Sequence, residues 1–189
     1  MNTPNKLTLL RVILVPVFLL LLYLVPEPYN YFSAVVIFVI AALTDSLDGY
    51  LARKNGQVTT FGKFLDPLAD KILVISALVY FVGANLASPV AVIIILAREF
   101  MVTSLRLVAV SSDGKVIAAG ILGKIKTVTQ MVSIIAILLL CGLLIMQVLP
   151  AAFSVYWTSR ILIWICAVVT VLSGLDYLFK NRNSVNTTK

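Results

Sequence analysis

The dominant pattern along the chain is a series of six apolar segments separated by short polar connections. Each segment has about the 20 residues that an α-helix needs to cross a hydrocarbon core. None shows the period-two alternation of a barrel strand, and a lipid-facing backbone must satisfy its hydrogen bonds internally. The pattern therefore predicts six transmembrane helices, at about residues 7–25, 31–51, 64–83, 89–110, 127–149 and 159–179.

The composition agrees with a membrane protein. Apolar residues make up 61% of the 189 residues, charged residues make up 12%, and the mean hydropathy is +1.06. These values are far from the soluble norm, so we expect an all-α polytopic membrane protein with a single domain over residues 1–189. The net charge of +7 does not indicate nucleic-acid binding, because the basic residues do not gather on a soluble face.

The basic residues instead mark one side of the predicted membrane. The connections after the first, third and fifth segments, "PEPYN", "GANLAS" and "PAAFSVYWTS", contain no lysine or arginine before Arg160. Because positive residues favour the inner side, both termini are expected in the cytoplasm. Thr3 and Pro4 suit the start of a short N-terminal interfacial segment. The basic residues of the opposite side are Lys6, Arg53, Lys54, Lys63, Lys115, Lys124, Lys126, Lys180, Arg182 and Lys189.

Four aspartates are concentrated in one stretch, "DSLDGYLARKNGQVTTFGKFLDPLAD", at residues 45–70. On a helix, Asp45 and Asp48 share one face, and so do Asp66 and Asp70. Two helices could thus bring two pairs of carboxylates together beside lipid, where charges are costly and mutually repulsive. A bound divalent cation would relieve both penalties, so the stretch predicts a metal site.

The expected metal follows from the available ligands. The chain has no histidine and its two cysteines lie in separate apolar segments, so oxygen ligands and hard cations such as Mg²⁺ or Mn²⁺ are favoured. Four aspartates could hold two ions. Gly49 and Gly62 leave space near the two pairs. Arg53 suits a phosphate clamp, although basic residues at a cytoplasmic helix end also have a purely topological role.

A second polar set lies in the fourth and fifth segments. Glu99 can neutralise Arg98, but Arg106, Lys124 and Lys126 leave an excess of positive charge that suits a phosphate-bearing ligand. Metals on one wall of a cytoplasm-facing cavity and cations on another would favour phosphoryl transfer. In a chain without histidine, a carboxylate is the expected general base.

The spacing Asp45-x2-Asp48-Gly49-x2-Ala52-Arg53-x8-Gly62-x3-Asp66-x3-Asp70 resembles the signature of the CDP-alcohol phosphotransferase family at all eight positions. The resemblance covers essentially the whole chain and implies a six-helix membrane architecture. It also implies two Mg²⁺ or Mn²⁺ ions, with Asp45, Asp48, Asp66 and Asp70 as ligands. Asp70 matches the proposed proton acceptor.

The same resemblance implies the substrate contacts. Gly49 and Arg53 match positions that contact the CDP moiety, and Thr59, Asn5 and Thr8 resemble further CDP-lipid contacts.

Within the family, "PNKLTLLRV", "GKFLDPLADK", "AREFMVTSLRLVA" and "GKIKT" look like members that transfer a phosphatidyl group from CDP-diacylglycerol to sn-glycerol 3-phosphate and release CMP. The acceptor phosphate would then meet Arg106, Lys124, Lys126 and Arg98. The resemblance further implies a homodimer in the inner membrane of a bacterium, with the active site facing the cytoplasm.

Two alternatives stay open on the sequence. A cardiolipin synthase or phosphatidylinositol-phosphate synthase would carry the same signature, because the signature specifies the CDP donor and not the acceptor alcohol. A divalent metal-ion transporter would also place acids within membrane helices. The position of all four aspartates near one boundary, with no matching acidic pair in the second half, is against the transporter.

Overall fold

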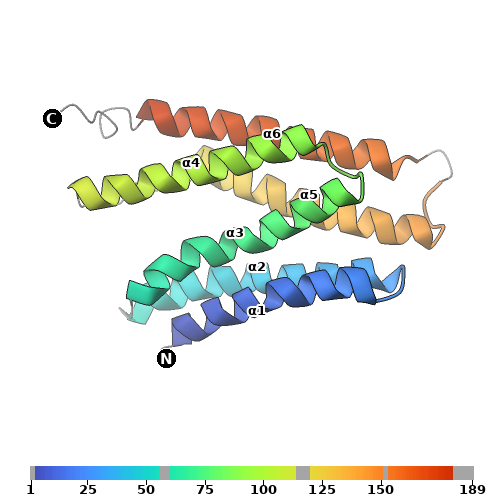
Figure 1. Ribbon diagram of the computed structural model, residues 1–189, viewed down its shortest axis with the longest axis horizontal. Helices are drawn as coiled ribbons and strands as arrows, with labels where there is room; N and C mark the ends of the chain where they lie inside the picture. Colours follow the sequence, from blue (N-terminus) through green and yellow to red (C-terminus); the bar gives the residue numbers. More distant parts are fainter. Residues whose placement is uncertain (1–2, 56–59, 114–119, 151–152, 181–189) are drawn as a thin grey trace. The chain divides into compact units, whose positions relative to one another are not determined.

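In the computed structural model of the protein, the described residues 3–55, 60–113, 120–150 and 153–180 form six α-helices and no strand (Figure 1). For residues 3–8, 45–55, 60–70 and 106–113, the description covers the backbone alone. This confirms the predicted all-α class. The helices are α1 (Thr3–Leu24), α2 (Tyr29–Asn55), α3 (Thr60–Gly83), α4 (Pro89–Asp113), α5 (Ile121–Ile145) and α6 (Val155–Lys180).

The helices coincide with the six predicted segments and differ from them mainly at their ends. Helix α5 begins at Ile121, six residues before the predicted start, because the polar "GKIKT" continues the helix and the Thr127 hydroxyl donates to the Gly123 carbonyl (3.1 Å). Helix α1 runs without interruption from Thr3, so the predicted interfacial segment is part of the same helix. Pro67 lies beyond the first turn of α3.

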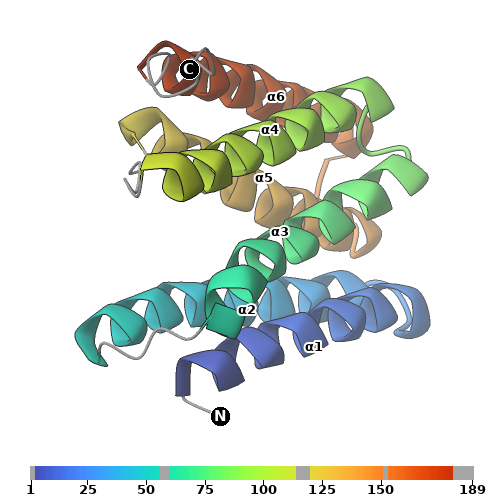
Figure 2. The same cartoon turned by 60° about the vertical axis from the view of Figure 1, so that its left-hand side comes forward.

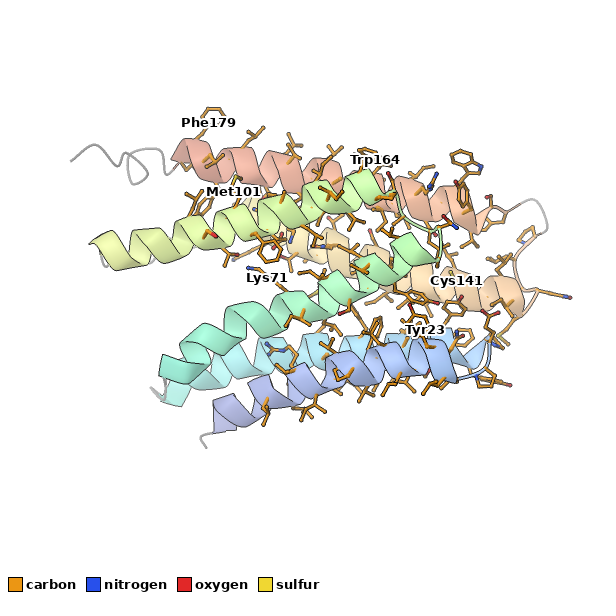
Figure 3. The ribbon with its side chains drawn as sticks, viewed as in Figure 1. Tyr23, Lys71, Met101, Cys141, Trp164 and Phe179 are labelled. Carbon is orange, nitrogen blue, oxygen red and sulfur yellow. The ribbon has the colours of Figure 1, made fainter. Side chains whose placement is uncertain are left out.

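Two described helices, α5 and α6, are long and apolar enough to cross a membrane by length and composition. Shorter apolar stretches occupy Leu9–Leu24 of α1, Tyr29–Thr44 of α2 and Lys71–Gly83 of α3. Large apolar side chains lie on the surface of α6, including Trp164 and the 72% exposed Phe179, which points away from its helix (Figure 3). Such exposed apolar area suits contact with lipid. The six membrane crossings and the cytoplasmic termini stay predictions.

The chain divides into two compact units. Unit 1 comprises residues 1–80 and 134–155, and unit 2 comprises residues 81–133 and 156–189. Helices α3 and α5 each contribute one part to each unit. Every contact described below lies within a single unit.

In unit 1, helices α1 and α2 run antiparallel and lie side by side (Figures 1 and 2). The Phe18 and Phe38 rings pack with centroids 6.1 Å apart, and the Asn30 side-chain amide donates to the Leu22 carbonyl (3.3 Å). Both contacts join residues on the buried face of each helix. They establish the register in which α1 faces α2.

The C-terminal half of α5 completes the core of unit 1 by approaching α2 closely. A Cβ atom added at Gly142 would lie 2.8 Å from Cζ of Phe32. Glycine allows this approach because it leaves room for the facing ring, as small residues do between packed membrane helices.

In unit 2, the N-terminal half of α5 runs antiparallel to α6. The Cys166 thiol lies 3.2 Å from the Ser133 hydroxyl. A Cβ added at Gly120, the residue before α5 begins, would lie 3.5 Å from the Asp176 carboxylate, ten residues after Cys166 on α6. Buried polar residues therefore recur along both facing stripes, and this polar seam comprises Lys126, Gln130 and Ser133 of α5 and Cys166, Thr170 and Ser173 of α6.

Candidate active site

The four aspartates lie on two helices of unit 1. Asp45 and Asp48 belong to α2, and Asp66 and Asp70 belong to α3. Because both stretches are helical, the spacings of three and four residues place each pair on one helix face, as predicted. Only residues 56–59 separate the two helices, so the end of α2 and the start of α3 lie within about 18 Å of each other.

Each aspartate pair also continues the buried stripe of its helix. On α2 the stripe consists of Ala34, Phe38 and Ala41, all fully buried, and the same 4, 3, 4, 3 spacing continues to Asp45 and Asp48. The helix face that packs against the rest of unit 1 is therefore the face on which the first pair lies.

On α3 the spacing runs in the other direction. Leu73 and Ala77 are buried, and stepping back by three and four residues along the same stripe leads to Asp70 and Asp66. Both pairs thus extend the interior-facing stripes of their helices.

The two pairs lie at matching depths from the α2–α3 connection. Asp45 is ten residues before the end of α2, and Asp70 is ten residues after the start of α3. Asp48 and Asp66 are seven and six residues from the same helix ends. At 1.5 Å per residue, each pair occupies the interval about 9–15 Å from the connection. Helix α3 begins beside α2 in both views (Figures 1 and 2).

The predicted CDP contacts have backbone positions only. Gly49 and Arg53 lie on α2 one helical turn apart, and Asn5 and Thr8 lie in the first turns of α1. Thr59 lies outside the described residues. The roles of these five residues stay predictions.

The basic residues predicted for the acceptor phosphate are distributed over unit 2. Lys126 is 7% exposed, and its ammonium pairs with the Glu99 carboxylate. Arg98 donates through Nη2 to the Ser173 hydroxyl (2.8 Å), and its Nη1 lies 3.4 Å from Oε1 of Glu99. We call Arg98, Glu99, Lys126 and Ser173 the ion cluster. Lys124 is exposed on α5, and Arg106 lies on α4, two turns beyond Glu99.

The ion cluster joins α4, α5 and α6 and holds two cations against one carboxylate. Its three charged side chains are 8–13% exposed. The sequence predicted that Glu99 neutralises Arg98, and the structure adds Lys126 as a second partner of the same carboxylate. The sequence pattern had not predicted a role for Ser173. The helical spacing of Cys166, Thr170 and Ser173 on α6 is a signal that could have indicated it.

Arg11 is a second buried polar residue for which the sequence pattern had predicted no role. It is only 2% exposed within the apolar part of α1. The signal was present in "LTLLRVILV", because an ionisable residue inside a predicted membrane helix indicates function or a buried partner.

The described residues form only helices, several of them rich in apolar residues, and the spacing of the two aspartate pairs continues the buried stripes of α2 and α3. Residues 1–172 match the CDP-alcohol phosphatidyltransferase family. The chain belongs to this family, and the protein is therefore an enzyme.

Similar proteins share most of the chain. The chain is 41% identical over 198 aligned positions, 98% of both chains, to a protein of Bacillus subtilis strain 168. It is 39% identical to a protein of Shigella flexneri serotype 5b over 96% of this chain and 95% of the relative. A protein of Pseudomonas fluorescens is 52% identical over 56% of this chain and 55% of its own length. Each is named CDP-diacylglycerol–glycerol-3-phosphate 3-phosphatidyltransferase.

Proposed function

We propose that the protein transfers a phosphatidyl group from CDP-diacylglycerol to sn-glycerol 3-phosphate, giving phosphatidylglycerophosphate and CMP. The observation that carries this proposal is the spacing of the two aspartate pairs, which continues the buried stripes of α2 and α3 at similar distances from the connection between these helices. Family membership supports the CDP donor, and the names of relatives that match almost the whole chain favour glycerol 3-phosphate as acceptor.

The donor set suits two Mg²⁺ or Mn²⁺ ions. Asp45, Asp48, Asp66 and Asp70 would hold them, because hard divalent cations prefer carboxylate oxygens and the chain has no histidine that would favour zinc. When bound, the ions supply charge neutralisation at the pyrophosphate of the donor and at the phosphorus under attack.

The residues of the chain perform the remaining steps. Asp70 accepts the proton of the acceptor hydroxyl, and the oxygen attacks the lipid-linked phosphorus. A new phosphorus–oxygen bond forms to glycerol 3-phosphate while the bond to the CMP phosphate oxygen breaks, and CMP leaves. Gly49 leaves room for the CDP moiety, and Arg53 binds its phosphates. Asn5, Thr8 and Thr59 provide further contacts to the nucleotide.

The acceptor phosphate is bound by cations of α4 and α5. The ion cluster has one positive charge more than its carboxylate neutralises, and Arg106 and Lys124 add to this charge. A phosphate-bearing acceptor compensates the surplus better than a neutral alcohol.

A lipid donor requires the site to be reached from a membrane. We place all six helices in the inner membrane of a bacterium, with both termini and the aspartates on the cytoplasmic side, because the basic connections lie on that side. A homodimer is part of the same proposal and is supported by the family resemblance alone.

An acceptor-competition assay tests the proposal. Purified protein is incubated with CDP-diacylglycerol, Mg²⁺ and either glycerol 3-phosphate, inositol 1-phosphate or phosphatidylglycerol, and CMP and the lipid product are measured together. We expect equal amounts of CMP and phosphatidylglycerophosphate with glycerol 3-phosphate, and none after EDTA treatment. Faster turnover with either other acceptor would assign the protein to a different branch of the family.

A further inference from the structure

Arg11 lies on the buried stripe of α1. The stripe consists of Arg11, Val15, Phe18 and Leu22, all no more than 6% exposed and spaced by four, three and four residues. Phe18 of this stripe packs against Phe38 of the α2 stripe. The face of α1 that holds Arg11 is therefore the face that meets α2.

The register of the two helices places Arg11 beside the first aspartate pair. Arg11 lies seven residues before Phe18 on α1, and Asp45 lies seven residues after Phe38 on the antiparallel α2. The contact between Leu22 and Asn30 gives a register shifted by four residues from that of Phe18 and Phe38, in which Arg11 is opposite residue 41. Because both helices rise 1.5 Å per residue, Arg11 lies level with residues 41–45 of α2.

The positions of the acidic residues of unit 1 indicate the same neighbours for Arg11. Its acidic residues are Glu27 and the four aspartates. Glu27 is exposed and follows the end of α1, at least about 20 Å from Arg11 along the helix axis. A buried arginine requires a nearby negative or polar partner, and within unit 1 the acids at its level are the aspartates.

We propose that Arg11 is a positioning residue of the aspartate site, whose guanidinium balances the carboxylates at the Asp45 level of α2. This inference rests on the proposed function, because it concerns the same aspartates. Arg11 acts on the carboxylates and not on the substrate. It reduces their mutual repulsion in the metal-free protein and keeps the Asp45 turn of α2 against α1.

The test compares thermal unfolding of the purified protein in EDTA and in Mn²⁺. In Arg11→Met the metal-free protein loses its internal countercharge, whereas bound Mn²⁺ supplies positive charge to the same carboxylates. We expect Mn²⁺ to raise the Tm of Arg11→Met by about 4 °C or more beyond the rise in the unsubstituted protein. Arg11→Lys keeps the charge and should show the unsubstituted rise.

Phe18→Leu is the matched control, because it perturbs the same stripe of α1 without changing charge. It should lower the Tm equally in EDTA and in Mn²⁺. Equal Mn²⁺-induced rises in Arg11→Met, Phe18→Leu and the unsubstituted protein would overturn the role of Arg11 and leave the proposed function intact. If Mn²⁺ does not change the Tm of the unsubstituted protein and no CMP forms, the aspartate site and this inference both fail.

A second variant covers the case in which Arg11→Met does not fold. Combining Arg11→Met with Asp45→Asn removes one negative charge together with the positive charge. The double variant should then be recovered as folded protein, because coupled charges compensate when both are removed. Failure to recover it, while Asp45→Asn alone folds, would contradict the assignment.

Discussion

Replacing Glu99 with glutamine tests the most completely described polar site of the protein. Glu99 is the only carboxylate of the ion cluster, and its Oε1 serves both Lys126 and Arg98. Glutamine has nearly the same shape but no charge. Two cations with side chains only 8% and 12% exposed would then lose the carboxylate that they share.

The expected loss in the free energy of unfolding is large for a substitution that keeps the shape of the side chain. Removing one partner from a buried ion pair costs about 3–5 kcal/mol in soluble proteins. The glutamine oxygen still accepts one hydrogen bond, and polar contacts between membrane helices are individually weaker, so we take about 3 kcal/mol. For a chain of this length, that corresponds to a fall in Tm of about 6–12 °C.

The two free cysteines provide the assay, because Cys141 and Cys166 are both buried. A maleimide dye that fluoresces on reaction with thiols reports unfolding when they become accessible. The double variant Glu99→Gln with Lys126→Met is expected to recover at least half of the loss, because the positive charge of Lys126 is removed together with the negative charge of Glu99. Asp176→Asn is the matched control and should cost less than about 0.5 kcal/mol, since its partner Lys180 has a 65% exposed side chain.

A Tm for Glu99→Gln within 2 °C, or roughly 1 kcal/mol, of that of the unsubstituted protein would contradict this prediction. Glu99 would then contribute no net stabilisation to the cluster. A double variant that loses the sum of both single losses would also contradict direct pairing of Glu99 with Lys126.

Three further outcomes are expected. Asp70→Asn should abolish CMP release while the Tm stays within a few degrees, and near-normal turnover would exclude Asp70 as the base. Gly142→Ala should cost about 1–3 kcal/mol in a thermal unfolding assay, because its Cβ would meet the Phe32 ring; Phe32→Leu should relieve part of that loss. Thr170→Val should leave the Tm unchanged or raise it, because among the described residues the buried Thr170 hydroxyl has no hydrogen-bond partner. A Tm fall above 4 °C for Thr170→Val would show that its hydroxyl is bonded.

The sequence alone determined the helical class, the approximate helix positions and the helix faces that hold the aspartates. These properties depend on short-range periodicity. The spacing of Asp45 and Asp48 places them on one face of any helix, and apolar runs near 20 residues indicate helices whatever they pack against. Helix α5 begins six residues before the predicted apolar segment, because hydropathy detects only the apolar part of a helix, whereas helical hydrogen bonding continues through polar residues such as Lys124 and Thr127.

The tertiary structure alone decided which distant residues meet. Glu99, Lys126 and Ser173 come together from three helices, although local spacing relates only Glu99 to its neighbour Arg98. Likewise, the level of Arg11 against α2 depends on the contact between Phe18 and Phe38, far apart in the chain. Side-chain periodicity repeats along each helix and so allows many registers between two helices. The register is selected by packing of particular side chains across the interface, which no single segment encodes.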